Sequence, residues 1–260
     1  MEAPRLIALD IDGTILRAGQ PISQRVLTGV ERAVAAGAHV VLATGRTALS
    51  TRPVLAELGL TAGSALCSNG AVWMDAASGE FPVVHRFDPA PVVGLLRNLL
   101  PGAYFAVEQL GTANLVTGPF PGDAEIAPTH LVDHLTLVVE PVTRLTAWWG
   151  GHTPEELQAR IGTIRLDGAR YSFDHEEPWI VAVPEGISKG ASLERLRVQL
   201  GVPETATVAI GDGENDVEML GWAAHGVAMG QAPHTVKAVA DEITGTLDED
   251  GAATILERWF

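Results

Sequence analysis

Four short polar clusters in the sequence combine residue types that can bind a metal ion and a phosphoryl group. They are residues 10–14 (DIDGT), 44–46 (TGR), 186–190 (GISKG) and 210–216 (IGDGEND). Two carboxylates two residues apart, as in Asp10 and Asp12, can ligate a hard metal ion or act as a nucleophile and its general acid–base partner. Alone, this cluster is interpreted equally well as an acidic turn, because Asp and Gly are common turn residues.

The second and third clusters offer hydrogen-bond donors for a phosphate oxygen. Thr44, Gly45 and Arg46 combine a hydroxyl, an unhindered backbone and a guanidinium. Taken alone, they are better explained as a glycine turn with a surface arginine. Lys189 is one of two lysines in the chain and stands where a helix is predicted to begin. A positive side chain there opposes the helix dipole unless an anion lies nearby, which favours a functional role.

The fourth cluster places Asp212, Glu214, Asn215 and Asp216 directly after an apolar run. Negative charge at this density is costly without a cation, so the cluster indicates a Mg²⁺ site. The plainer alternative is an Asp-Gly turn with acids in the first turn of a helix, and function is favoured over it. Neither a GxxxxGK[ST] loop nor a GxGxxG turn after the first strand occurs, which disfavours nucleotide triphosphatases and dinucleotide-dependent dehydrogenases.

The elements around these clusters predict an α/β fold with a Rossmann-like, doubly wound parallel sheet. Apolar runs at residues 6–9, 39–43 and 64–68 alternate with two helices, the first capped by Ser23 and closed by Gly37 and the second ending at Gly59. The same rhythm returns after Pro184, with a helix over 188–200 and strands over 207–210 and 226–229. Ligands bind at the carboxyl ends of such strands, so the four clusters are expected to converge there.

The segment between the two α/β parts has a different pattern. Short β-type runs are expected at residues 104–108, 114–116, 135–139, 170–173 and 179–183, and helices at 91–100 and 154–161. This pattern predicts an inserted α+β cap of about 100 residues, a usual domain size. We therefore divide the chain into a core domain of residues 1–82 and 184–260 and a cap domain of residues 83–183.

Composition narrows the class of partner. The chain has 260 residues, 17 basic and 32 acidic, and a formal net charge of −15, so no nucleic-acid or membrane partner is expected. The single cysteine, Cys67, excludes an internal disulfide and favours a packing role in a reducing compartment. With no apolar run long enough to span a membrane and no signal-peptide pattern, we expect a cytoplasmic protein, monomeric or homodimeric.

Together the clusters resemble the haloacid dehalogenase-like (HAD) phosphohydrolases, and most closely the Cof-like, class IIB branch with a large cap. The matching motifs are LIALDIDGTIL (6–16), VLATGR (41–46), SNGA (68–71), GISKGASL (186–193), AIGDGENDVEML (209–220), GVAMGQA (226–232), ADEIT (240–244) and EDG (249–251). They cover the core domain in the family's order and spacing. The cap resembles the family in position and length only.

The resemblance implies roles for individual residues. Asp10 would be the nucleophile that forms an aspartyl-phosphate, and Asp12 the general acid and then the base. Mg²⁺ would be held by Asp10, the Ile11–Asp12 region and Asp212, with Asp216 either ligating or supporting. The phosphoryl group would be bound by Ile11, Thr44, Gly45, Lys189 and Asn215, and Arg46 and Asn69 are candidate substrate contacts.

The function expected from this resemblance is Mg²⁺-dependent hydrolysis of small phosphate esters, sugar phosphates first. One alternative is a phosphomutase of related fold. Another is a phosphosugar sensor without turnover, which the intact Asp10 and Asp12 pair argues against. Substrate choice is expected to lie with polar cap residues such as Glu108 and Asn114.

Overall fold

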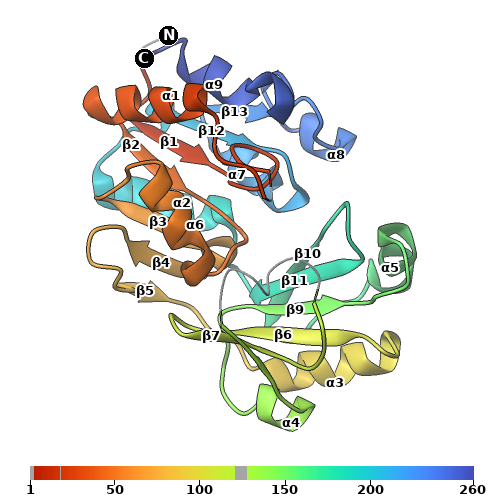
Figure 1. The fold of residues 1–260 in the computed structure, drawn as a ribbon. Coiled ribbons are helices and arrows are strands. Elements are labelled where there is room, and N and C mark those ends of the chain that lie inside the picture. The colour runs from red at the N-terminus through yellow and green to blue at the C-terminus, as the bar shows by residue number, and fades with distance from the viewer. Residues whose placement is uncertain (1–2, 18, 121–127) are drawn as a thin grey trace.

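Strand β1 (Leu6–Leu9) lies inside a parallel sheet and carries the first acidic cluster at its carboxyl end (Figure 1). The computed structural model describes residues 3–17, 19–120 and 128–260. Within them the strand order of this sheet is β14-β13-β12-β1-β2, and every neighbouring pair is parallel. The other strands are β2 (His39–Leu42), β12 (Thr207–Gly211), β13 (His225–Ala228) and β14 (Glu242–Ile243).

Helices cover both faces of the parallel sheet because its strands are apolar on both sides. Ile7 and Leu9 share a core with α1 and α9, whereas Leu6 and Ala8 share one with α6 and α7. This two-sided burial is typical of parallel sheets. The helices of this part are α1 (Gln24–Ala35), α2 (Ala48–Glu57), α6 (Lys189–Leu200), α7 (Val217–Trp222), α8 (His234–Lys237) and α9 (Gly251–Leu256). As predicted, Ser23 caps α1, accepting a hydrogen bond from the amide of Val26.

The third predicted strand has mainly antiparallel partners. Strand β3 (Ser64–Cys67) pairs with β4 (Val72–Asp75), which pairs in turn with β5 (Val83–Val84). One parallel bridge, between Ala43 and Leu66, joins β3 to the chain that follows β2. The short 3₁₀ turn η1 (Ser68–Gly70) connects β3 to β4 and lies beside the start of α6.

The inserted segment forms a second sheet below the first in Figure 1. Its strand order is β10-β11-β9-β6-β7-β8 within the described residues, antiparallel except for β7 and β8. Helices α3 and α5 pack on one face of it. The elements are α3 (Pro89–Leu99), β6 (Tyr104–Gln109), β7 (Ala113–Val116), β8 (Thr129–Leu131), α4 (His134–Leu137), β9 (Leu145–Trp148), α5 (Pro154–Ile161), β10 (Ala169–Phe173) and β11 (Trp179–Pro184). The predicted α/β core with an α+β cap is therefore confirmed.

One predicted strand is wrong. Residues 135–139 were expected to be β, but α4 occupies most of this stretch. The Asp133 side chain accepts a hydrogen bond from the amide of Thr136 at 2.8 Å and so caps a helical turn. Leu135 and Val139 are about three-quarters exposed, so this apolar run does not form a buried sheet face. The strand in this part of the cap is β9, which the expected β runs did not include.

The division at residue 82 stays a prediction, and β5 qualifies it. Val83 and Val84 pair with Trp73 and Val72 of β4, and the amide of His85 donates to the carbonyl of Ala71. The first residues assigned to the cap are thus hydrogen-bonded to the sheet that extends the core.

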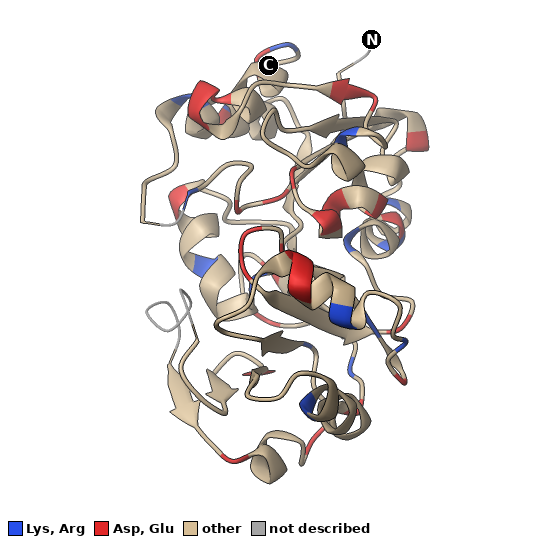
Figure 2. Ribbon diagram, turned by 90° about the vertical axis from the view of Figure 1, so that its right-hand side faces the viewer, with Lys and Arg blue, Asp and Glu red and all other residues tan. Residues whose placement is uncertain are grey.

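Two global properties bear on partners. Acidic residues outnumber basic ones along the chain, as the red and blue segments of Figure 2 show. Among the described residues, no helix combines the length and the apolar character needed to cross a bilayer.

Candidate active site

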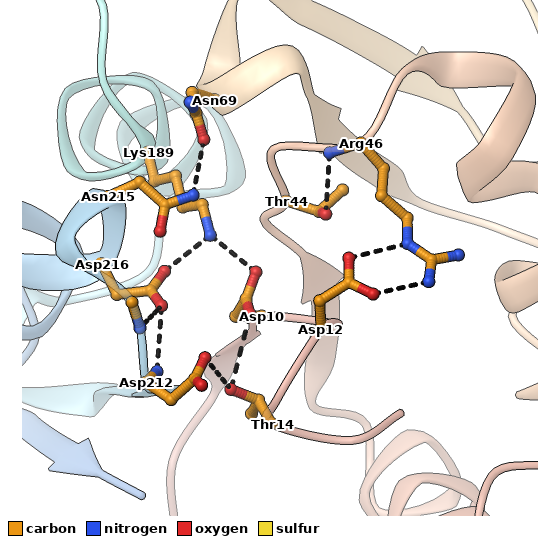
Figure 3. Close-up of polar contacts among 11 residues, drawn as sticks. Asp10, Asp12, Thr14, Thr44, Arg46, Asn69, Lys189, Asp212, Asn215 and Asp216 are labelled. Atoms are coloured by element: carbon orange, nitrogen blue, oxygen red, sulfur yellow. Dashed lines mark hydrogen bonds and ion pairs between the residues drawn. The ribbon is translucent and has the colours of Figure 1, made fainter. Parts of the chain in front are cut away.

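Four segments far apart in the sequence converge at the carboxyl edge of the parallel sheet. Asp10 follows β1, Thr44 follows β2 and Asp212 follows β12, and these three strands are neighbours. Lys189 begins α6 at the same edge (Figure 3). The convergence expected from the strand ends is therefore present, and the side chains point toward one another.

Lys189 is the centre of a buried ion-pair network. Its ammonium Nζ lies 2.6 Å from Oδ1 of Asp10 and 2.6 Å from Oδ1 of Asp216. The Lys189 and Asp216 side chains have no exposed surface, and that of Asp10 is 7% exposed. Burial alone would lower the pKa of Lys189, but the two carboxylates outweigh it and raise the pKa. These anions also explain how a lysine is tolerated in the first turn of α6.

Backbone amides and a hydroxyl orient the acidic side chains. Oδ2 of Asp216 accepts hydrogen bonds from the amides of Asp212 and Gly213, at 3.0 and 2.9 Å. The Thr14 hydroxyl lies 3.5 Å from Oδ2 of Asp10 and 3.4 Å from Oδ1 of Asp212. Gln231 lies beyond them, with its amide nitrogen 3.4 Å from Oδ2 of Asp212. Each carboxylate is thus held in a defined direction before any ligand is bound.

Gly13 is required by this packing. Its φ is +76°, and a Cβ built on it would lie 2.0 Å from Oδ2 of Asp212. Any side chain here would push Asp212 out of the cluster, besides straining the backbone. The glycine of the DIDGT cluster therefore allows the turn after β1 to approach the turn after β12.

The acidic cluster suits a divalent cation. One oxygen from each of Asp10, Asp212 and Asp216 lies within 4.8 Å of the others, and all three residues are buried. Lys189 supplies one positive charge against three carboxylates. Burial and the charge of Asp216 raise the pKa of Asp212 to about 7, and the same two causes raise the pKa of Asp10 well above its usual range. A hard cation with oxygen ligands relieves this repulsion, so the donor set fits Mg²⁺.

Asp12 lies apart from the acidic cluster. Its carboxylate forms two bonds with the Arg46 guanidinium, 2.8 Å from Nε and 2.6 Å from Nη2. The Asp12 side chain is 54% exposed, whereas that of Arg46 is 13% exposed. This forked ion pair holds Asp12 at the open side of the site. Asp12 is therefore not one of the three clustered acids.

The segment after β2 packs against the η1 turn. Thr44 is fully buried, and its hydroxyl accepts a hydrogen bond from the amide of Arg46 at 3.1 Å. A Cβ on Gly45 would lie 3.3 Å from Oδ1 of Asn69 and 3.4 Å from Nδ2 of Asn215. Those two side chains are themselves joined, since Asn215 donates to Asn69 at 2.9 Å. Gly45 and Asn215, two expected phosphate contacts, thus adjoin each other and Asn69, which is a candidate substrate contact.

The η1 turn is strained and is held from the cap. Ser68 and Asn69 have φ values of +50° and +53°, a left-handed conformation that costs a non-glycine residue about 1–2 kcal/mol. Oε2 of Glu108, from β6, accepts hydrogen bonds from the hydroxyls of Ser68 (2.7 Å) and Thr143 (2.8 Å). Oε1 of Glu108 accepts one from the amide of Ala48, at 3.0 Å. A buried cap carboxylate therefore ties both the η1 turn and the start of α2 to the cap.

Comparison with known protein families identifies the family to which this chain belongs. The sequence profile of the haloacid dehalogenase-like hydrolases matches residues 7–101 and 153–256, which is well over half of the chain. The chain belongs to the haloacid dehalogenase-like hydrolases. The resemblance indicated by the motifs is thereby confirmed.

Named relatives and solved structures support this family assignment. The 5-amino-6-(5-phospho-D-ribitylamino)uracil phosphatase YitU of Bacillus subtilis is 29% identical, over 99% of this chain and 98% of its own length. A haloacid dehalogenase-like hydrolase from Bacteroides thetaiotaomicron has a TM-score of 0.80 at 30% identity, covering 99% of this chain and 100% of its own. The subclass IIB sugar phosphatase BT4131 shares the fold, with a TM-score of 0.82 at 23% identity and 98% coverage of both chains. This HAD hydrolase is a phosphatase.

The sequence predicted no catalytic or binding role for several residues that contact the acidic cluster in the structure. Thr14 and Gln231 belong to the DIDGT and GVAMGQA motifs, so the sequence marks both positions. Glu108 was expected to contact substrates, but both of its oxygens accept hydrogen bonds from protein groups, two of them on the core side of the site. No sequence pattern marks that role, because the partners of Glu108 are 35 to 60 residues away in the chain.

Glu108→Ala is expected to slow turnover of every ester, because it releases the strained η1 turn and leaves the Ala48 amide, Ser68 and Thr143 without their acceptor. We expect about a tenfold loss of kcat/KM and about 1–3 kcal/mol lower stability. Glu140→Ala, which removes an exposed cap carboxylate outside the cavities of about 350 and 430 Å³ beside the cap sheet, is the control. Steady-state kinetics with several esters and denaturant unfolding provide the measurements. A Glu108 variant that affects only some esters would contradict the structural role.

Proposed function

We propose that this HAD hydrolase is a Mg²⁺-dependent phosphomonoesterase that hydrolyses small phosphorylated metabolites through an aspartyl-phosphate intermediate. The observation that carries the proposal is the placement of Asp10. Its carboxylate is buried, aligned by Lys189 and Thr14, and two residues from an acid that lies outside the ion-pair network. A fixed carboxylate nucleophile next to a separate acid–base group is what two-step phosphoryl transfer needs.

Different residues of the chain carry out the chemical steps and bind the phosphoryl group. Asp10 attacks phosphorus, and the bond from phosphorus to the ester oxygen breaks as the new one forms. Asp12 gives its proton to the departing oxygen. It then takes a proton from the water that attacks phosphorus, and the bond from Asp10 to phosphorus breaks, which releases inorganic phosphate and restores the carboxylate. Lys189, Thr44, Gly45, Asn215 and the backbone at Ile11 bind the equatorial oxygens, where charge must be stabilised in the transition state. Arg46 holds Asp12 on the side where the alcohol leaves.

Asp10, Asp212 and Asp216 would hold Mg²⁺, with the Ile11–Asp12 backbone beside them, and Asp216 either ligates it or orients Asp212. The bound ion would neutralise charge on the phosphoryl oxygens and on the clustered carboxylates. Asp216 already uses one oxygen for Lys189 and the other for two amides, which suits it to orienting the neighbouring acids.

The proposed substrates are small phosphate esters, with sugar and sugar-alcohol phosphates first. Support comes from the relative named as a phosphatase of a phosphoribitylamino-uracil, which spans almost the whole chain. Phosphate release from a panel of phosphate esters, including that compound and hexose phosphates, tests the proposal. Release of inorganic phosphate supports hydrolysis. Isomerised product without phosphate would instead indicate a phosphomutase, and binding without any reaction would indicate a sensor.

Removing divalent ions with a chelator is expected to abolish turnover, and Mg²⁺ should restore it far better than Ca²⁺. Ca²⁺ prefers more ligands and bonds of about 2.3–2.6 Å, which do not fit a compact three-carboxylate site. Mg²⁺ should also raise the melting temperature, because it binds only the folded cluster and relieves its repulsion. Full activity in excess chelator, or equal rates with Ca²⁺, would refute the metal assignment.

A further inference from the structure

Glu214 belongs to the IGDGEND cluster of the sequence, but it faces the cap and not the metal-binding carboxylates. It begins the short 3₁₀ turn η4 (Glu214–Asp216) and is exposed. Within the described chain, the three carboxylates that could hold a metal ion do not include that of Glu214. Its Oε2 instead accepts a hydrogen bond from the backbone amide of Phe173, in β10 of the cap, at 3.2 Å. This acid of the cluster therefore has a structural partner in the other domain.

A second acid, four residues later, contacts the same cap strand. Oε1 of Glu218, in α7, lies 2.5 Å from Nη1 of Arg170, and the two side chains are 46% and 42% exposed. Strand β10 is an edge of the cap sheet, so alternate amides along it have no partner within the sheet. The amide of Asp174 points inward to its neighbouring strand, so the amide of Phe173 points outward, where Glu214 accepts from it. Glu214 and Glu218 thus form one docking edge on the core for β10.

The contact between cap and core at the β6–β7 end is of a different kind. Glu108 is buried and accepts three hydrogen bonds, two of them from the core groups Ala48 and Ser68. Leu110, in the turn between β6 and β7, packs against the hydrophobic cluster of the core domain. Separating a buried carboxylate from its donors is costly, whereas exposed ion pairs contribute little to stability. The docking edge is therefore the weaker of these two contacts.

The interface at the docking edge is also loosely packed. A cavity of about 350 Å³ lies between β10 and the docking edge, with Arg170 and Ser172 on the cap side and both docking acids on the core side. Close-packed protein interiors contain few voids larger than a water molecule, so little apolar contact is lost if these two surfaces separate. Lys189 and Asn215 line the same cavity. The β10–β11 hairpin therefore covers the side of the site where the phosphoryl group is expected to bind.

We propose that Glu214 and Glu218 seat the cap strand β10 on the core, and that this contact releases while the Glu108 end of the cap stays bound. The β10–β11 hairpin then moves away from Lys189 and Asn215, and the β6–β7 end acts as the pivot. Glu214 is a positioning residue, because it bonds to the cap backbone and to none of the reacting groups. This movement does not depend on which ester the enzyme hydrolyses.

Distances between pairs of spin labels, measured by pulsed electron paramagnetic resonance without substrate, test this movement directly. Labels on Glu176→Cys, in the β10–β11 loop, and Ala238→Cys, after α8, span the docking edge. Labels on Thr112→Cys, between β6 and β7, and Ala56→Cys, on α2, span the pivot, and all four positions are exposed. The native Cys67 is buried and burial raises its pKa to about 12, so only the introduced thiols react with the label.

We expect the double variant Glu214→Ala with Glu218→Ala to lengthen and broaden the distance distribution across the docking edge and to leave the distance across the pivot unchanged. Gln at both positions keeps an oxygen acceptor for the Phe173 amide and for Arg170, so it should largely restore the short distance. Glu31→Ala, which removes an exposed acid from α1, is the control and should change neither distance.

The double alanine variant should also lose about threefold to tenfold in kcat/KM, because only the docked fraction of molecules is competent. If this variant does not fold, Arg170→Met breaks the Glu218 contact from the cap side and should lengthen the same distance. An unchanged distance across the docking edge in a folded variant would overturn the proposal, and so would an equal change in both distances. Neither result would affect the phosphomonoesterase function, which phosphate release by the wild-type enzyme tests separately.

Discussion

Asp10→Asn is expected to abolish phosphate release, with a loss of at least about 10³-fold in kcat. An amide of the same shape cannot attack phosphorus, so no aspartyl-phosphate can form. The fold should persist, because the amide oxygen of the new side chain can still accept a hydrogen bond from Lys189 and the variant removes one of three crowded negative charges. The measurements are phosphate release and mass spectrometry for a phosphorylated peptide containing residue 10.

The control for Asp10 is Asp167→Asn, which removes the same charge from an exposed aspartate. It should leave turnover unchanged. Retention of more than about a tenth of the wild-type rate in Asp10→Asn, a barrier change below about 1.4 kcal/mol, would reject Asp10 as the nucleophile.

Lys189→Met is expected to lower both stability and turnover. It leaves the buried carboxylates of Asp10 and Asp216 without their cation, and breaking such a pair costs about 3–5 kcal/mol. Turnover should fall for every ester alike, because the proposed contact of Lys189 is with the phosphoryl group that all esters share. Denaturant unfolding and kinetics with several esters give the two readouts.

The second lysine, Lys237, offers a matched control, since it is partly exposed at the end of α8. Lys237→Met should change neither the free energy of unfolding nor the turnover of any ester by much. If Lys189→Met fails to fold, adding Asp216→Asn should restore folding without activity, because one uncompensated charge is removed. Selective loss for some esters only would show that Lys189 serves the alcohol and not the phosphate.

The parts of this molecule that could be predicted from sequence are those governed by local patterns. Leu6–Leu9 is apolar at every position, so a buried strand ending at Asp10 follows from hydrophobicity alone. The α6 boundaries follow from the Ser188 cap and from Gly201, which adopts a left-handed conformation at the helix end. Because the carboxyl ends of parallel strands lie at one edge of the sheet, the proximity of Asp10, Thr44 and Asp212 could also be predicted.

Contacts between distant segments could not be predicted in the same way. The pairing of Glu108 with Ser68 and Ala48 depends on how the cap sits on the core, and neither partner has a pattern that requires it. The prediction of a strand at 135–139 was wrong because a short run of β-favouring residues cannot distinguish a strand from a capped helical turn with exposed leucine and valine.

The position of β1 between β2 and β12 has a consequence for the order in which the protein matures during synthesis. Leu6 pairs on one side with His39, which is made soon after it, and on the other with Thr207, which leaves the ribosome only after the whole cap sheet. Closing so long a loop is slow, whereas the cap strands β6 to β11 are contiguous and can pair first. A nascent chain therefore carries Asp10 and Asp12 for most of its translation without Lys189, Asp212 or Asp216. Catalytic competence should appear as one of the last events of folding, once β12 inserts beside β1.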